Sequence, residues 1–187
     1  VFYSGNSVES IFELNLNSSN SSNLTVFASL YGNATTNPHF LPTTSLVTLY
    51  DESDARGMQY LDLTNNHIFK YVGQVAPLAD TQADARVSTY TYRASSSAPN
   101  WIVYRLADIY LMKAEALAIS GTTPADFDQV ATLCNKTYIR CHPEGADSLD
   151  HALFSDNNSA YTQVLEERRR EFAFEGKRWF DLLRQVR

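Results

Sequence analysis

The segment WIVYRLADIYLMKAEALAI, residues 101 to 119, is the most apolar part of the chain and constrains the fold most strongly. As a helix it is apolar around most of its circumference, with Ile102, Leu106, Ile109 and Ala116 on one side and Val103, Ala107, Tyr110, Ala114 and Leu117 beside them. Such a helix must be surrounded by other elements. Its four charged residues, Arg105, Asp108, Lys113 and Glu115, exclude a plain membrane span.

Three further helices are expected after Gly121. The segment TTPADFDQVATLCNKTYIR has an N-cap threonine and a proline in its first turn, which is typical of a helix start. The next helix should run from about 159 to 175 and end before Gly176. KRWFDLLR then predicts a short last helix with Trp179, Leu182 and Leu183 facing inward.

Arg168 is the most informative residue of the predicted helix 159–175 for how the helices pack, because it lies on the same face as Tyr161, Val164 and Leu165. A guanidinium that faces a core needs a carboxylate partner. We therefore expect the helix 101–119 to pack against residues 166–184, with Asp108 or Glu115 meeting Arg168 or Arg169. The predicted structural ion-pair network comprises Arg105, Asp108, Glu115, Arg168, Arg169 and Asp181.

The first hundred residues have little regular pattern. IFELNL predicts a short strand, residues 17 to 45 form a long irregular region, and SLVTLYDES predicts a short helix. HIFKYVGQV predicts a short extended piece, and the stretch up to Asn100 is mostly loop. Long irregular regions in a domain often form a functional surface.

Composition and motifs exclude several functions. The net charge is −6, and the basic run EERRREFAFEGKRWFDLLR has six cations against five anions, so no basic face for nucleic acid is expected. No nucleotide, zinc-protease or serine-hydrolase motif is present, and no cofactor or metal is predicted. Cys134 and Cys141 match no metal or haem spacing, and we expect two unpaired, partly buried thiols.

Glu171 and Glu175 are interpreted as salt-bridge partners and not as a catalytic pair.

Aromatic residues in the loops favour a binding surface. The chain has 11 Tyr, 10 Phe and 2 Trp, and several of them lie in the irregular first half. Exposed aromatic faces suit stacking on sugar rings, although each ring taken alone is at least as well explained as a loop anchor in the core. The predicted ligand-binding residues are Tyr31, His39, Phe40, Tyr90 and Tyr92.

Two segments together resemble one known family. NWIVYRLADIYLMKAEALAISG resembles the "RLADvlLmyAEAL" helix, and ERRREFAFEGKRWFDLLR resembles the "ERrrELafEGhRwfDLrR" signature, of the SusD/RagB family of outer-membrane nutrient-binding lipoproteins. SVESIFELNL, LVTLYDESDAR and FKYVG are similar to further family segments in the same order. The chain departs from the family pattern at AEALAISG, which lacks the usual asparagine, and at TYIRCHPEG.

The resemblance implies a fold and a function. The expected fold is mainly α, the helical, loop-rich C-terminal part of a SusD-like fold containing tetratricopeptide-type helix pairs, with a few short strands. Residues 1–100 would form a loop-rich subdomain and 101–187 the signature helices. The implied protein is a surface-exposed lipoprotein of a Gram-negative outer membrane, attached by an N-terminal lipid anchor that this chain lacks. It would bind a glycan or other nutrient without cleaving it and deliver it to a SusC-like TonB-dependent transporter.

Two other functions remain open. One is a purely structural helical interaction module, and the other is a glycoside hydrolase, which would need two carboxylates facing each other across a cleft.

Overall fold

A computed structural model describes residues 2, 5–16, 26–33, 35–75, 90–93, 99–143 and 148–185. The chain divides into two compact units. Residues Val1–Leu49 and Arg56–Val103 form the first, here called the loop-rich unit. Residues Tyr50–Ala55 and Tyr104–Arg187 form the second, the helical unit.

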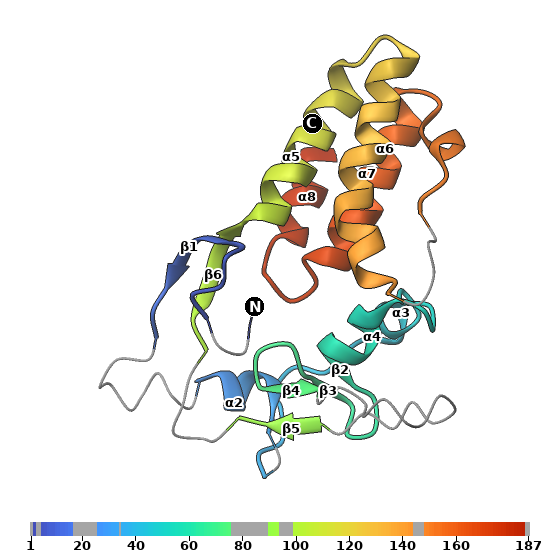
Figure 1. Cartoon of the computed structure of the whole chain (residues 1–187). Coiled ribbons are helices and arrows are strands. Elements are labelled where there is room, and N and C mark those ends of the chain that lie inside the picture. Colours follow the sequence, from blue (N-terminus) through green and yellow to red (C-terminus); the bar gives the residue numbers. More distant parts are fainter. Residues whose placement is uncertain are drawn as a thin grey trace. The chain divides into compact units, whose positions relative to one another are not determined.

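The helical unit is built from four α-helices: α5 (Leu106–Ser120), α6 (Pro124–Tyr138), α7 (Asn157–Glu171) and α8 (Arg178–Gln185). Two short 3-10 helices, η1 (Ile139–Cys141) and η2 (His151–Phe154), connect α6 to α7. Figure 1 shows α5, α6 and α7 packed side by side. The prediction of a mainly helical chain with a few short strands is confirmed. No helix in the described ranges is both long and apolar enough to cross a membrane.

The predicted helix 101–119 is wrong at its start. Residues Trp101–Arg105 form a strand, β6, and α5 begins only at Leu106. The sequence WIVYR is rich in aromatic and β-branched residues, which favour strands. Arg105 has extended dihedral angles, and its backbone N–H donates to the Asp108 side chain, so the first helical turn is capped at this position.

The other helix ends follow local chemistry. Thr123 is the N-cap of α6 and Pro124 lies in its first turn, as predicted. Asp156 caps α7 by accepting a hydrogen bond from the backbone N–H of Ser159. The predicted end of α7 at 175 is four residues too late, because the chain leaves the helix after Glu171 and passes through positive φ at Phe174 and Gly176.

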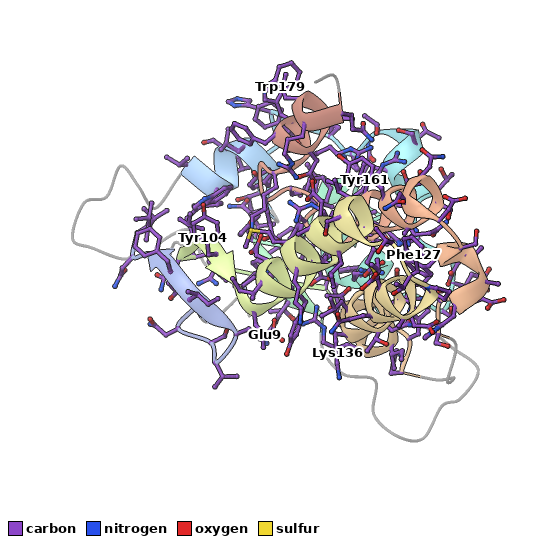
Figure 2. The ribbon with its side chains drawn as sticks, turned by 90° about the horizontal axis from the view of Figure 1, so that it is seen from above. Glu9, Tyr104, Phe127, Lys136, Tyr161 and Trp179 are labelled. Atoms are coloured by element: carbon purple, nitrogen blue, oxygen red, sulfur yellow. The ribbon has the colours of Figure 1, made fainter. Side chains whose placement is uncertain are left out.

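The core of the helical unit lies between α5, α6 and α7. Its α5 face consists of small residues and one leucine, which allows close helix approach. The buried apolar side chains are Ala107, Leu111, Ala114, Ala118, Val130, Ala131, Leu133, Cys134, Leu149, Phe154, Ala160, Val164 and Phe172. Phe127 and Tyr161, labelled in Figure 2, pack against this cluster. Cys134 and Cys141 are both buried and form no disulfide, as predicted.

The structure corrects the predicted orientation of α8. Trp179, Leu182 and Leu183 were expected to face inward, yet they are 66%, 39% and 45% exposed. Asp181 is the buried residue of this helix, at 1% exposure. An ion pair and not an apolar face therefore attaches α8 to the unit, and Figure 2 shows Trp179 projecting from α8.

The predicted enclosure of α5 is also incorrect for the described part of the chain. Leu106, Ile109, Met112 and Ile119 are between 40% and 63% exposed. Only the opposite side of α5 contacts α6 and α7.

The loop-rich unit contains short elements joined by turns. Its helices are α2 (Val26–Tyr31), α3 (Thr44–Val47) and α4 (Ala55–Tyr60). Of these, α2 lies where an irregular region was expected. Its strands are β1 (Ser10–Leu14), β2 (Leu61–Asp62), β3 (His67–Ile68), β4 (Gly73–Val75), β5 (Tyr90–Tyr92) and the first three residues of β6. They form three two-stranded sheets, β1 with β6, β2 with β3, and β4 with β5.

Two registers position side chains in the loop-rich unit. In the antiparallel pair of β2 and β3, Asp62 lies opposite His67. In the antiparallel pair of β4 and β5, Gly73 lies opposite Tyr92. A Cβ atom at Gly73 would lie 2.3 Å from Cζ of Phe69 and 2.5 Å from the carbonyl oxygen of Thr91, so only glycine permits this close approach.

Candidate ligand-binding site

Tyr92 is held by a hydrogen-bonded cluster of strand residues. Its hydroxyl donates to Oδ2 of Asp62 at 2.5 Å and lies 3.0 Å from Nδ1 of His67. Because the hydroxyl proton points to the carboxylate, the oxygen accepts a hydrogen bond from Nδ1–H of His67. Burial raises the pKa of Tyr92, and the hydrogen bond and charge of Asp62 raise it further. Tyr92 is therefore a neutral, fixed hydroxyl.

Asp62 has no lone pair left for a ligand. Oδ1 accepts from the backbone N–H groups of Thr64 and Asn65, and Oδ2 accepts from the side-chain amide of Asn65 as well as from Tyr92. Burial alone would raise the pKa of Asp62, but these hydrogen bonds outweigh it and the pKa lies below its ordinary value. Asp62 thus orients Tyr92.

Phe69 supports both predicted tyrosines of β5. This fully buried ring makes edge contacts with Tyr90 at 4.9 Å and with Tyr92 at 5.1 Å between ring centroids. Tyr90 and Tyr92 each remain half-buried. Burial raises the pKa of Tyr90, and the charge of Asp62 adds to this effect.

Tyr31 belongs to a stack of three aromatic rings. It stacks on Tyr71 with centroids 5.7 Å apart, and Tyr71 stacks on Trp101 at 5.3 Å. Phe27 packs at a tilt against all three rings. Tyr71 is fully buried, whereas Tyr31 and Trp101 at the two ends are half-buried. Burial raises the pKa of Tyr31.

His39 and Phe40 are exposed and tied to α2. Their backbone N–H groups donate to the carbonyl oxygens of Ser29 and Leu30 at 3.0 and 2.9 Å. The Phe40 side chain is 56% exposed. Among the predicted Tyr and Phe residues it is the exposed one, and its ring can stack on a flat apolar partner.

Gly32 brings these groups into one neighbourhood. It has φ of +85°, and a Cβ there would lie 3.1 Å from both Nδ1 of His67 and Cδ of Pro38. The end of α2, the segment of His39 and Phe40, and the His67–Tyr92 pair therefore adjoin one another. We call Tyr31, His39, Phe40, Tyr90 and Tyr92 the aromatic site.

Asp62, His67, Tyr71 and Trp101 were not among the residues predicted for this region. One signal was available for two of them, because HIFKY alternates, so that His67, Phe69 and Tyr71 share one face of an extended segment. Trp101 was assigned to the predicted helix 101–119 and was therefore not counted among the aromatic residues of the loops.

A separate ion-pair network lies in the helical unit. Arg105, 1% exposed, donates to Oε1 of Glu171 at 2.5 Å, to both carboxylate oxygens of Glu175 and to the carbonyl oxygen of Glu171. Arg140 also pairs with Glu171. Both glutamates are thus fully engaged with arginine, which explains their burial and leaves no pair of carboxylates facing a cleft at this position.

Arg168 connects three elements. It donates to both oxygens of Asp181 at 3.1 and 2.8 Å, and its Nε lies 3.7 Å from Oε2 of Glu115. Arg184 donates to both oxygens of Glu115 at 2.9 Å and to Asp181 at 2.7 Å. The expected contact between α5 and Arg168 is thus present through Glu115, while the closer partner of Arg168 is Asp181.

The remaining predicted charges have other partners. Asp108 accepts two hydrogen bonds of 2.6 Å from Lys177. Arg169 pairs with Glu166 at 3.5 Å on the surface and meets neither Asp108 nor Glu115. Within the described residues no group of three or more His, Cys, Asp or Glu could hold a metal ion.

An open pocket of about 310 Å³ lies on the outer side of α6. Its lining residues are Thr132, Asn135, Lys136, Ile139, Ser148 and His151. None of the residues predicted to bind a ligand lines this pocket, and the amide of Asn135 is occupied by both backbone groups of Leu149.

Comparison with known proteins identifies the family. The SusD family model matches residues 84–186, more than half of the chain. SusD-like protein P38 of Formosa agariphila is 29% identical over 119 residues, which are 62% of this chain and 24% of that protein. This chain thus spans about a quarter of that relative's length.

Solved structures agree in fold. A SusD homolog from Bacteroides thetaiotaomicron VPI-5482 has a TM-score of 0.68 at 24% identity, over 97% of this chain and 38% of that one. A SusD-like protein from Bacteroides fragilis NCTC 9343 has a TM-score of 0.61 at 21% identity, over 97% and 44%. At these identities the likeness shows the fold alone, but the family model adds a direct sequence match. The chain therefore belongs to the SusD family.

Proposed function

We propose that this chain is part of a protein that binds a glycan or another nutrient at the outer surface of a Gram-negative bacterium and does not cleave it. The match of residues 84–186 to the SusD family carries the proposal. In this proposal the whole protein is a lipid-anchored outer-membrane protein that passes its ligand to a SusC-like TonB-dependent transporter.

The aromatic site is the proposed contact surface within this chain. Phe40 would stack on the apolar face of a sugar ring, because its apolar ring is exposed whereas the three tyrosines of the set are half-buried. His39 and the fixed hydroxyl of Tyr92 would supply polar contacts beside it. Half-buried Tyr31 and Tyr90 would form the rigid base of this surface.

Binding without cleavage agrees with the positions of the acidic residues. Glu171 and Glu175 were the pair of carboxylates considered as catalytic residues for glycoside hydrolysis. Both accept hydrogen bonds from Arg105. Asp62, the carboxylate closest to Tyr92, has four hydrogen bonds of its own. These groups cannot also act as acid and base on a sugar.

Isothermal titration of the whole protein against a panel of oligosaccharides and peptides tests the proposal. We expect the protein to bind one class of these ligands. Phe40→Ala should raise the Kd for that ligand about tenfold, which corresponds to about 1.4 kcal/mol of binding free energy. Phe12→Ala is the matched control, because Phe12 is also in the loop-rich unit and is 52% exposed. The bound glycan should be recovered intact after incubation.

Two results would contradict the proposal. Absence of binding to every glycan and peptide would favour the structural interaction module. Release of shorter sugars would favour the glycoside hydrolase. If binding occurs but Phe40→Ala and Phe12→Ala behave alike, the function stands and the aromatic site is wrong.

A further inference from the structure

His67 ends a chain of three hydrogen-bonded side chains in the loop-rich unit, with Tyr92 and Asp62 as the other members. Nδ1 of His67 lies 3.0 Å from the Tyr92 hydroxyl, which donates to Oδ2 of Asp62 at 2.5 Å. The ionised carboxylate can only accept, so the Tyr92 proton points to Asp62 and the Tyr92 oxygen accepts the bond from His67. Nδ1 of His67 therefore carries a proton.

The direction of these bonds fixes the state of the other ring nitrogen of His67. A neutral imidazole carries one proton, so with that proton on Nδ1 the Nε2 atom has a free lone pair. In the part of the chain that the structure describes, Nε2 has no hydrogen-bond partner. His67 is half-buried and is thus not closed off from solvent. The outer end of the chain of hydrogen bonds is therefore a bare acceptor.

Two packing contacts hold the imidazole in this orientation, besides the bond to Tyr92. Its ring meets the Tyr92 ring edge-on, with centroids 6.0 Å apart. Its Nδ1 and Cε1 lie 3.1 and 3.2 Å from the position that a Cβ of Gly32 would occupy. Turning the ring over would take Nδ1 away from Tyr92. The acceptor is thus held in place before any ligand arrives, which lowers the cost of binding.

Nε2 lies beside the aromatic site. Cε1, the ring atom bonded to Nε2, faces Gly32 at the end of α2, and Cδ of Pro38 approaches Gly32 equally closely. Pro38 directly precedes His39 and Phe40 in the sequence. The acceptor and the ring proposed to stack on a sugar therefore belong to one neighbourhood.

We propose that His67 is a further ligand-contact residue, whose Nε2 accepts a hydrogen bond from a hydroxyl group of a bound saccharide. The inference rests on the proposed function, because that function supplies the ligand class. A carboxylate, sulfate or phosphate group does not suit this position, since the bare nitrogen has no proton to donate to an anion. A sugar hydroxyl would extend the chain toward Asp62 with every donor pointing the same way, and such aligned hydrogen bonds strengthen one another.

The protonation of the ring can be measured before any ligand is added. 15N NMR of the imidazole side chains in the whole protein distinguishes a protonated from a bare ring nitrogen, and the spectrum of His67→Asn assigns the His67 signals. At about pH 8, where imidazole is ordinarily neutral, we expect the proton on Nδ1 and a bare Nε2. A proton on Nε2 would overturn the proposal, whichever ligand the protein binds.

Binding then tests the contact itself. The probes are oligosaccharides of glucose, mannose, galactose, xylose and glucuronic acid, and the peptides of the same panel. His67→Asn keeps an amide N–H in the place of Nδ1 but has no atom in the place of Nε2. It should raise the Kd of the bound oligosaccharide about three- to tenfold. In the unaltered protein, binding of the same oligosaccharide should shift the Nε2 resonance.

His151→Asn is the matched control. Nδ1 of His151 also lies 3.0 Å from a carboxylate oxygen, that of Asp128, but this pair belongs to the helical unit. The Kd of His151→Asn should equal that of the unaltered protein.

The outcomes separate this contact from the proposed function. Unchanged binding by His67→Asn, or an Nε2 resonance that does not move when the oligosaccharide binds, would overturn the contact and leave the function standing. Binding of peptides alone would do the same, because the contact requires a sugar hydroxyl. Absence of all binding would overturn both. If His67→Asn also lowers the Tm, the Nε2 resonance of the unaltered protein decides.

Discussion

Arg105 donates hydrogen bonds to Glu171 and Glu175, which lie 66 and 70 residues farther along the chain. The arginine ends β6 and caps α5, while the glutamates lie at and beyond the end of α7. The backbone of Arg105 therefore caps the start of α5, while its guanidinium connects this position to the end of α7.

Arg105→Met should destabilise the protein by about 3 to 5 kcal/mol, because two buried carboxylates lose their main partner. Lys136→Met is the control, since the side chain of Lys136 is exposed and its loss should cost within about 0.5 kcal/mol. Urea unfolding of both variants measures the difference. Equal losses would show that the Arg105 network contributes little.

Tyr92→Phe should cost about 1 to 2 kcal/mol at pH 7, because it removes a hydrogen bond to a charged carboxylate. The pKa of Asp62 is lowered in the folded protein, so its contribution is present above the ordinary value of 3.8 and is lost as the pH falls through the folded value. The cost of Tyr92→Phe should therefore shrink on acidification. Unfolding measured at a series of pH values from 7 down to 2 tests this, and a cost that stays constant over the whole series would argue against the carboxylate as the partner.

Gly73→Ala should destabilise the loop-rich unit by about 1 to 3 kcal/mol, because the new Cβ would overlap Phe69 and the backbone of Thr91. Gly176→Ala provides the comparison. Gly176 has φ of +76° but no neighbouring atom within 4 Å, so only backbone strain of about 1 kcal/mol is expected there. Thermal unfolding of the two variants should rank Gly73→Ala as the more damaging.

Asn157→Ala should cost about 1 kcal/mol, because the side-chain amide donates to the carbonyl oxygens of Ala118 and Gly121 at the end of α5. Asn158→Ala, at the next position of the same helix, is the control. Hydrogen exchange at the last turn of α5 should accelerate in Asn157→Ala alone. Similar exchange in both variants would argue against this cap.

The sequence was sufficient wherever local chemistry decides the structure. Thr123 and Pro124 located the start of α6, and the burial of Arg168 followed from its spacing to Val164 and Leu165. The orientation of α8 was not accessible in this way, because its apolar residues suggest one buried face while Asp181 is drawn to Arg168 on another. That choice depends on a contact between separate helices.

The aromatic site shows the same limit. Loop aromatics can be selected by composition, but the cluster around Tyr92 depends on the registers that place Asp62 opposite His67 and Gly73 opposite Tyr92. Those registers come from strands of two or three residues, whose pairing has almost no signature in the sequence.

The ion pairs of the helical unit also have an evolutionary consequence. Apolar core residues can be substituted one at a time by residues of similar size and shape. A substitution of Arg105, in contrast, leaves the buried charges of Glu171 and Glu175 without their arginine partner. Substitution at any one of these three positions should therefore be accepted only together with changes at the others. In a collection of family sequences they should vary as a linked group, while exposed Lys136 varies independently.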